Sequence, residues 1–308
     1  MSLPPDHEQR LARARLALEG LSVGDAFGDD FEFADLEVIL EQVQNRELPP
    51  IPWHFTDDTN MALSIFENLR QYGQIDQDAL AISFANHYEP SRSYGAGAFL
   101  LLHDIKKGGD WRVLARQMFK GAGSYGNGGA MRIAPLGAYF ASDDMEVVIE
   151  QAKRSAEITH THLEGIAGAI VIAVATAIAW RMHETGQKPD CAAFIDAVLP
   201  HIPPGEVQRK CQLARDLPAG TTVEQAVKAI GSGHWESAQA SVPFALWCAA
   251  EHLYDYEEAI WQTASGGIDV DTTCAMVGGI VAMVTDIEGI PSLWIKNRET
   301  LPEWAFVG

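Results

Sequence analysis

The segment Thr56-Asp57-Asp58-Thr59 has the residue types best suited to chemistry, because it gathers carboxylate and hydroxyl oxygens at one point. Apolar residues recur at four-residue spacing from Met61 to Leu69, which predicts that the segment opens a helix over residues 57–72. Such a segment can serve as an ordinary helix cap and complement the helix dipole. It can also bind a hard cation such as Mg²⁺, Mn²⁺ or Ca²⁺, since these ions prefer oxygen ligands.

A second acidic group lies far downstream, where Asp269, Asp271 and Thr272 precede an apolar run from Cys274 to Val281. The two groups share one pattern, in which carboxylates and hydroxyls stand at the start of a buried helix. Four carboxylates brought together without cations would repel one another. Either the two groups lie apart in the fold, or divalent cations lie between them.

The twelve residues 121–132 contain five glycines, which let the backbone turn tightly and approach a ligand closely. Backbone N–H groups exposed in this way are suited to phosphate. The segment does not match a P-loop, because no Gly-Lys-Ser/Thr follows, and it lacks a G-x-G-x-x-G with flanking strands. A flexible loop without a ligand is the alternative interpretation.

His160 and His162 stand just before an apolar stretch over residues 165–180. Being two residues apart, they would face different sides of a helix and would not readily share one metal ion, so a structural role is the default for each. The stretch is shorter than the roughly 20 residues of a membrane span and is rich in alanine. It therefore predicts a central helix buried on all sides, and no membrane association is expected.

Helical periodicity without strand-like alternation predicts an all-α protein, and no composition shift divides the single domain 1–308. Residues 24–32, with two glycines and four acids, are expected to form a loop. The helices expected from the apolar spacing cover residues 7–23, 57–72, 76–87, 96–105, 111–119, 145–159, 165–180, 223–230, 241–252, 256–263 and 273–286.

The overall charge limits the classes of partner. Lys and Arg total 22 against 42 Asp and Glu, so the net charge is −20, which argues against binding duplex nucleic acid. An anionic small ligand remains possible if cations and helix N-termini supply local positive potential. The four cysteines are scattered without a C-x-x-C pair, and no secretory signal is evident, so a cytoplasmic location is expected.

Four motifs in the order of one known family span residues 24 to 273. They are Gly24-Asp25-x-x-Gly28-x-x-x-Glu32, Thr56-Asp57-Asp58-Thr59-x-Met61, Gly126-Asn127-Gly128-x-x-Met131-Arg132 and Asp269-x-Asp271-Thr272. Together they resemble the ADP-ribosylglycohydrolase family. The first motif and the run from Ser124 to Asn127 are similar to the branch that acts on ADP-ribosylated serine, poly(ADP-ribose) or O-acetyl-ADP-ribose.

This resemblance implies a compact all-α fold with two divalent ions, Mg²⁺ or Mn²⁺, between the acidic groups. It implies as metal ligands Thr56, Asp57, Asp58, Asp269, Asp271 and Thr272. It implies as the residues that bind ADP-ribose Phe119, Gly123, Ser124, Tyr125, Gly126, Asn127, Gly128, Met131 and His160. Glu32 is the candidate catalytic carboxylate, because the other acids would be neutralised by metal.

The implied activity is hydrolysis at the anomeric carbon of ADP-ribose, which releases ADP-ribose from modified protein side chains. A monomer is expected, although the sequence does not fix the oligomeric state. Two alternatives are a hydrolase of a free metabolite such as O-acetyl-ADP-ribose and a non-catalytic member that binds ADP-ribose. One departure concerns Ile268, which stands where the family usually has a second glycine before the Asp-x-Asp-Thr motif. It places the choice of substrate in question.

Overall fold

The computed structural model describes residues 3–31, 34–231 and 236–307 of the chain. Over these residues the protein is all-α, as the sequence predicts. The described part contains no strand, and only two isolated β-bridges occur in it, between Trp53 and Arg298 and between Gly126 and Ser237.

Within the described residues, sixteen α-helices are joined by short loops and 3₁₀ turns. Their bounds are α1 His7–Gly28, α2 Leu36–Asn45, α3 Asp57–Tyr72, α4 Gln77–Asn86, α5 Ala96–Lys106, α6 Trp111–Gln117, α7 Ala134–Tyr139, α8 Met145–Ala156, α9 Leu163–Glu184, α10 Cys191–Val198, α11 Glu206–Arg215, α12 Val223–Ile230, α13 Ala238–Glu251, α14 Tyr256–Ala264, α15 Val270–Gly289 and α16 Ser292–Asn297.

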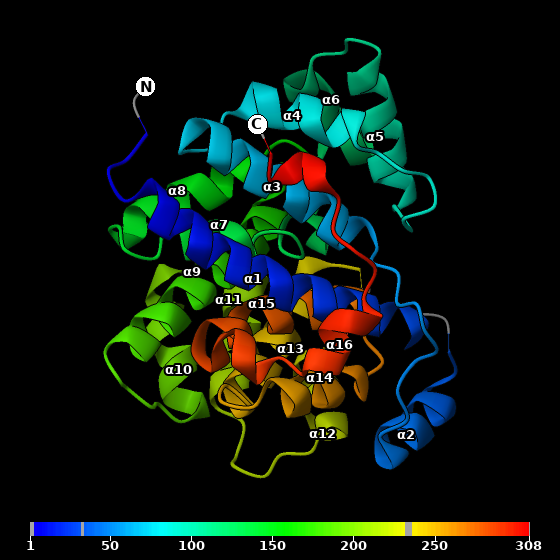
Figure 1. Ribbon diagram of the computed structural model, residues 1–308, viewed down its shortest axis with the longest axis vertical. Helices are drawn as coiled ribbons and strands as arrows, with labels where there is room; N and C mark the ends of the chain where they lie inside the picture. Colours follow the sequence, from blue (N-terminus) through cyan, green and yellow to red (C-terminus); the bar gives the residue numbers. More distant parts are fainter. Residues whose placement is uncertain (1–2, 32–33, 232–235, 308) are drawn as a thin grey trace.

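Three long helices, α1, α9 and α15, form the centre of the molecule. α3 to α6 gather at one end and α10 to α14 at the other, while α1 crosses between them (Figure 1). α9 is buried without interruption from Gly165 to Ala179, which confirms the expected central helix. α9 and α15 are long and apolar enough to cross a membrane, but most of each lies inside the fold, which accounts for their composition.

The expected loop over residues 24–32 is wrong over residues 24–31, because α1 continues to Gly28 and a 3₁₀ helix follows at Asp29–Phe31, while Glu32 lies outside the described residues. Gly20, Gly24 and Gly28 recur every four residues and lie on one face of α1. A Cβ on Gly24 would lie 2.2 Å from the carbonyl oxygen of Cys274, and one on Gly28 would lie 2.6 Å from the Cα of Asp271. These glycines therefore allow close packing of α1 on α15 rather than a turn.

This close packing has a consequence for the acidic residues. It brings the N-terminal turn of α15, which carries Asp271, against the last turns of α1. Asp25 is itself part of α1 and is completely buried. The carboxylate of Asp25 is therefore placed next to the two acidic groups.

Candidate active site

The N-termini of α3 and α15 meet, so the two acidic groups lie together. The hydroxyl of Thr272 donates a hydrogen bond to Oδ1 of Asp58 across 3.5 Å. Asp57 is 8% exposed and Asp271 is 6% exposed, so both are buried, while Asp269 is half-buried. Of the two arrangements open from the sequence, the fold adopts the one in which the carboxylates converge.

Burial and mutual repulsion raise the pKa values of these carboxyls. Burial first, then Asp25 and Asp269, raise the pKa of Asp57 to about 8. Burial, Asp25 and Asp271 raise the pKa of Asp58 well above its ordinary value. Burial likewise raises the pKa of Asp269 to about 6. The convergence is thus costly when all the carboxylates are charged and no cation is close.

Asp25 is a member of this centre whose role the sequence did not reveal. Its two oxygens accept hydrogen bonds from the backbone N–H groups and the hydroxyls of Thr56 and Thr59. Burial nevertheless raises the pKa of Asp25 to about 6. In the sequence, Asp25 stood out only as a member of the Gly24-Asp25-x-x-Gly28-x-x-x-Glu32 motif, in a segment expected to be a loop.

Thr56 also performs the structural function considered from the sequence. It is the N-cap of α3, and its hydroxyl oxygen accepts a hydrogen bond from the N–H of Asp58 at 3.3 Å. Asp269 is the N-cap residue of α15 in a left-handed conformation, with φ 44° and ψ 65°, and its side chain caps nothing. A left-handed aspartate is unusual, and the carboxylate of Asp269 accepts a hydrogen bond from the side-chain amide of Asn127.

The donors of this centre suit a divalent cation. They are all carboxylate or hydroxyl oxygens, the ligands that Mg²⁺ and Mn²⁺ prefer. Oδ2 of Asp58 is buried and has no hydrogen-bond partner among the residues described. Within residues 3–31, 34–231 and 236–307, no three acidic, histidine or cysteine side chains already stand together at metal-ligand spacing. Binding an ion would therefore require the carboxylate side chains to move closer to one another.

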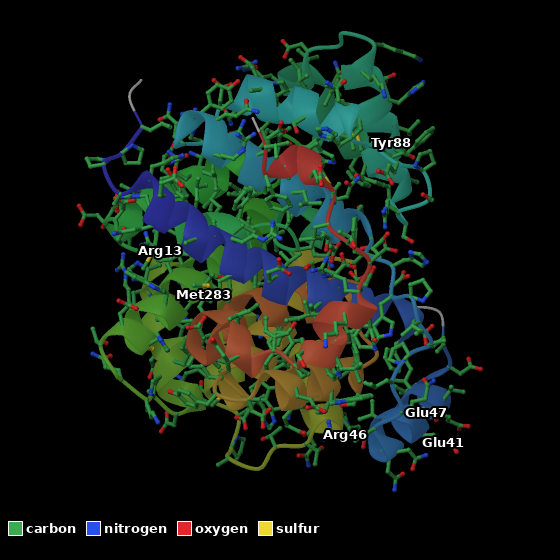
Figure 2. All side chains as sticks on the ribbon, viewed as in Figure 1. Arg13, Glu41, Arg46, Glu47, Tyr88 and Met283 are labelled. Carbon is green, nitrogen blue, oxygen red and sulfur yellow. The ribbon has the colours of Figure 1, made fainter. Side chains whose placement is uncertain are left out.

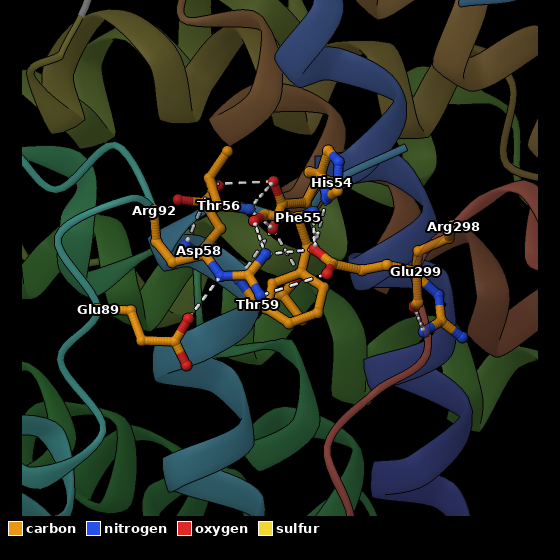
Figure 3. A network of polar contacts seen from close by, with 10 residues as sticks. His54, Phe55, Thr56, Asp58, Thr59, Glu89, Arg92, Arg298 and Glu299 are labelled. Atoms are coloured by element: carbon orange, nitrogen blue, oxygen red, sulfur yellow. Dashed lines mark hydrogen bonds and ion pairs between the residues drawn. The ribbon is translucent and has the colours of Figure 1, made fainter. Parts of the chain in front are cut away.

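The backbone before α3 is fixed by a polar network that the sequence did not predict (Figure 3). The guanidinium of Arg92 pairs with Glu299 and donates to the carbonyl oxygen of Phe55 at 2.7 Å. Glu299 accepts the N–H of Phe55 at 2.9 Å, and the carbonyl oxygen of Arg92 accepts the N–H of Asp57 at 2.8 Å. The C-terminal segment thereby holds the first acidic group in place.

The glycine segment is attached to the second acidic group. The side-chain amide of Asn127 donates to the carboxylate of Asp269 and, at 3.0 Å, to the hydroxyl of Ser241. The hydroxyl of Ser124 accepts the N–H of Gly126 at 3.2 Å. Gly123 has φ +75°, and a Cβ there would lie 2.2 Å from the hydroxyl oxygen of Thr161. The segment is therefore ordered rather than a free loop.

The two histidines have different surroundings. His162 is the N-cap of α9, and its Nδ1 accepts the N–H of Glu164 at 3.1 Å, so it is structural. The ring of His160 lies against the glycine segment, where a Cβ on Gly128 would lie 2.8 Å from its Cε1. Burial and the charge of Arg132 lower the pKa of His160 to about 3, so its ring is neutral.

The comparison with known families identifies the family of the chain. A family model described as ADP-ribosylglycohydrolase matches residues 6–306. This chain belongs to the ADP-ribosylglycohydrolase family.

Several relatives match over nearly the whole chain. ADP-ribosylhydrolase ARH3 of Homo sapiens is 29% identical, and the match covers 95% of this chain and 91% of that relative. The protein of the same name from Bos taurus is 30% identical, and the match covers 95% of this chain and 90% of that relative. ADP-ribosylarginine hydrolase Tri1 of Pseudomonas putida is 23% identical over 94% and 75%. A solved structure described as an ADP-ribosylglycohydrolase-related protein complex has a TM-score of 0.68 at 24% identity, with coverage of 95% and 94%, and shares the fold.

In this member of the family, one exposed aromatic side chain lies before the glycine segment and a second lies within it. Phe119 is 57% exposed and Tyr125 is 40% exposed, and their ring centroids are 6.3 Å apart. Phe119 and Lys120 both have positive φ, of 51° and 60°, which is an unusual backbone for two consecutive residues other than glycine. Met131 is buried behind the segment, with its sulfur 3.8 Å from where a Cβ on Gly128 would lie.

Ile268, the departure from the family pattern, is completely buried. Its Cδ1 would lie 2.3 Å from a Cβ on Gly231, so the side chain points into the core and not toward the carboxylates. Gly267 has φ +60° and supplies the turn before Asp269. With isoleucine at position 268, the backbone turn before this motif is therefore formed at Gly267.

Glu32, the candidate catalytic residue, lies outside the residues that the structure describes. A separate cavity of about 610 Å³ lies between α1, α9 and the end of α15, where Figure 2 labels Arg13 and Met283. None of the residues predicted to bind metal or ADP-ribose lines this cavity.

Proposed function

We propose that this chain is a divalent-metal-dependent hydrolase that cleaves the bond at the anomeric carbon of ADP-ribose and releases ADP-ribose from modified protein side chains. The observation that carries the proposal is the convergence of buried carboxylates from α3 and α15, beside a glycine segment tied to Asp269 by Asn127. A helix-capping role explains Thr56 alone. It does not explain why several carboxyls share one buried centre at the cost of raised pKa values.

The residues proposed to hold two Mg²⁺ or Mn²⁺ ions are Thr56, Asp57, Asp58, Asp269, Asp271 and Thr272. When bound, such ions would orient the ribose hydroxyls and lower the pKa of a water molecule. The hydroxyl of Thr56 donates its proton to Asp25, so its lone pairs remain available to a cation. Charged carboxylates would then be paired with cations instead of repelling one another.

Hydrolysis of a ribosyl bond passes through a transition state with oxocarbenium character, in which the leaving group takes a proton and water attacks the anomeric carbon. A carboxyl that is free of metal can move that proton. Glu32 is proposed for this role because it belongs to the Gly-Asp-x-x-Gly-x-x-x-Glu motif and is not among the converging ligands.

The diphosphate and ribose are proposed to lie along residues 123–128, where small residues let a ligand approach the backbone. Phe119, which precedes this segment, and Tyr125, which lies within it, offer exposed aromatic faces that suit an adenine ring. A neutral His160 adds a polar ring edge against Gly126 and Gly128 without adding charge.

The serine-linked type of substrate is favoured over the arginine-linked type. The motif from Gly24 to Glu32 and the run from Ser124 to Asn127 are similar to the branch that acts on ADP-ribosylated serine, and the relative named ADP-ribosylarginine hydrolase is only 23% identical. The net charge of −20 works against long poly(ADP-ribose), because like charges repel. O-acetyl-ADP-ribose remains the alternative substrate, as it shares the ADP-ribose moiety.

The test is release of free ADP-ribose from four matched substrates, measured with Mg²⁺, with Mn²⁺ and with EDTA. The substrates are serine-linked and arginine-linked ADP-ribosyl peptides of the same sequence, O-acetyl-ADP-ribose and short poly(ADP-ribose). We expect turnover of the serine-linked peptide that EDTA abolishes. Turnover of only O-acetyl-ADP-ribose would support the alternative, and tight ADP-ribose binding without turnover of any substrate would indicate a non-catalytic member.

A further inference from the structure

The side chains of Arg132, Thr159 and His160 are linked in a series that leads from the buried core to the glycine segment. Nη2 of Arg132 donates a hydrogen bond to the hydroxyl oxygen of Thr159 at 2.8 Å. The same oxygen lies 2.7 Å from Nδ1 of His160. Thr159 thus stands between an arginine that is 1% exposed and the histidine beside Gly126 and Gly128.

The direction of each hydrogen bond follows from the donors available. A guanidinium can only donate, so the Thr159 oxygen is an acceptor toward Arg132. Its single proton then has one partner within the described part of the chain, which is Nδ1 of His160. If Nδ1 carried the proton instead, the Thr159 oxygen would accept twice and its own buried proton would have no acceptor, which is costly.

The tautomer of His160 follows from this direction. Nδ1 accepts a hydrogen bond, so the neutral ring carries its proton on Nε2. Nε2 has no hydrogen-bond partner among the residues described, and it would lie 3.1 Å from a Cβ on Gly128 and 3.3 Å from one on Gly126. An N–H donor is therefore held at the surface of the glycine segment with no protein acceptor in the described part of the chain.

Arg132 has an environment that a merely structural arginine would not need. Its guanidinium lies 4.6 Å from the centroid of the Phe84 ring, and its Nε is buried without a hydrogen-bond partner among the described residues. No carboxylate forms a salt bridge with it in residues 3–31, 34–231 and 236–307, although Asp57 and Asp58 attract it from a distance. A buried cation that is only partly satisfied requires an explanation.

We propose that Arg132 and Thr159 are positioning residues that hold His160 in its Nε2–H form and direct this N–H at an anionic oxygen of the ligand on the glycine segment. The proposal rests on the proposed function for the identity of the ligand, a nucleoside diphosphate sugar. Its oxygens accept hydrogen bonds, and charged acceptors bind an N–H more strongly than neutral ones. The tautomer itself depends only on the fold.

The first test measures the tautomer directly by NMR of protein labelled with ¹⁵N at histidine, with the His160 signals assigned by His160→Gln. We expect the Nε2–H form in the wild type. In Thr159→Val, which removes the hydroxyl and keeps the shape, we expect a shift toward the Nδ1–H form, and in Thr159→Ser a return to the wild-type pattern. An Nδ1–H tautomer in the wild type would overturn the inference, whether or not any variant folds.

The second test measures ADP-ribose binding by calorimetry in the presence of Mg²⁺. We expect Thr159→Val to weaken binding about five- to tenfold through one lost hydrogen bond, and Thr159→Ser to restore it. Thr176→Val is the matched control, because it removes another buried hydroxyl, one that bonds to the carbonyl oxygen of Ile172 at 2.7 Å. Unchanged binding in Thr159→Val would overturn the positioning role.

The two tests separate this inference from the proposed function. Hydrolysis of an ADP-ribosyl substrate by a wild type with the Nδ1–H tautomer would overturn this inference alone. An Nε2–H tautomer in a protein that neither binds nor hydrolyses any ADP-ribose compound would overturn the proposed function and, with it, the assigned ligand.

Discussion

Oδ1 of Asp25 accepts a hydrogen bond from the hydroxyl of Thr56 across 2.9 Å. This bond joins the last turns of α1 to the N-terminus of α3. The same carboxylate accepts the backbone N–H of Thr56 at 3.1 Å. With its proton directed at Asp25, the Thr56 oxygen has lone pairs free for the N–H of Asp58 and for a cation. Asp25 thus orients a proposed ligand, as the outer carboxylates of metal sites generally do.

The substitution Asp25→Asn should weaken metal binding, because an amide places N–H donors against the donors of Thr56 and Thr59. We expect Mn²⁺ affinity, measured by calorimetry, to fall about 10- to 100-fold, the usual effect of losing a group that orients a metal ligand. Asp30→Asn is the matched control, since it removes an acid near the end of α1 that is exposed. Equal Mn²⁺ affinity in Asp25→Asn and wild type would show that Asp25 does not orient the site.

The packing of α1 on α15 predicts a large effect of a single methyl group at Gly28. In Gly28→Ala the new Cβ would lie 2.6 Å from both the Cα of Asp271 and the carbonyl oxygen of Val270, and backbone atoms cannot move aside cheaply. We expect the free energy of unfolding in urea to fall by about 1–3 kcal/mol, despite the better helix propensity of alanine.

Gly95→Ala provides the comparison for this variant. Gly95 has no atom within 4 Å of the position that its Cβ would occupy, so we expect its unfolding free energy to change by less than about 0.5 kcal/mol. If both alanine variants were equally stable, the close approach of α1 and α15 would not constrain Gly28.

The helices with strong apolar spacing were predictable from the sequence. α3 and α12 have the predicted bounds, and α9 is the expected central helix. The extension of α1 was not predicted, because glycine is typical of turns as well as of close helix packing, and the two cannot be distinguished without the partner helix. α2 was also missed, since its short amphipathic pattern follows an irregular segment.

For the site, the pattern of carboxylates and hydroxyls singled out two groups at helix N-termini but left open whether the two groups would lie together. The roles of Asp25, Arg132 and Glu299 were not predictable, because each depends on a partner distant in the sequence. Asp25 bonds to Thr56, and Glu299 bonds to Arg92. A buried acid and a surface acid look the same in one sequence until the fold supplies the partner.

The raised carboxyl pKa values predict how the stability of the metal-free protein varies with pH. Asp57 has a pKa of about 8 in the fold against about 3.9 in an unfolded chain. Between these values the folded state holds a proton that the unfolded state has lost, so stability falls as pH rises from about 4 to about 8. We expect the Tm in EDTA to decrease between about pH 5 and about pH 8.

Cations should reverse this trend, because they pair with the charged carboxylates. The rise in Tm on adding Mn²⁺ should therefore be larger at about pH 8 than at about pH 5. Asp57→Asn, which removes the group with this pKa, should show a shallower decrease of Tm with pH in EDTA. An identical slope in wild type and Asp57→Asn would rule out Asp57 as the source of the pH dependence.

Glu32 is predicted to move a proton and not to hold the ions. Glu32→Gln should keep Mn²⁺ and ADP-ribose affinity within about twofold while turnover falls by about 10²- to 10⁴-fold, the usual contribution of general acid–base catalysis. Calorimetry checks the predicted affinities, and product release measured on the same preparation checks the predicted loss of turnover. Normal turnover of Glu32→Gln would show that another group moves the proton.

The central claim is that the carboxylates at the N-termini of α3 and α15 hold the cations on which hydrolysis depends. It is tested most directly by adding Mn²⁺ back to EDTA-treated protein and recording, in one titration, Mn²⁺ bound and ADP-ribose released from a serine-linked peptide, for wild type and Asp271→Asn. The account predicts that release rises with bound Mn²⁺ in the wild type and that Asp271→Asn loses both together. Full release by metal-free protein, or by Asp271→Asn without bound Mn²⁺, would contradict it.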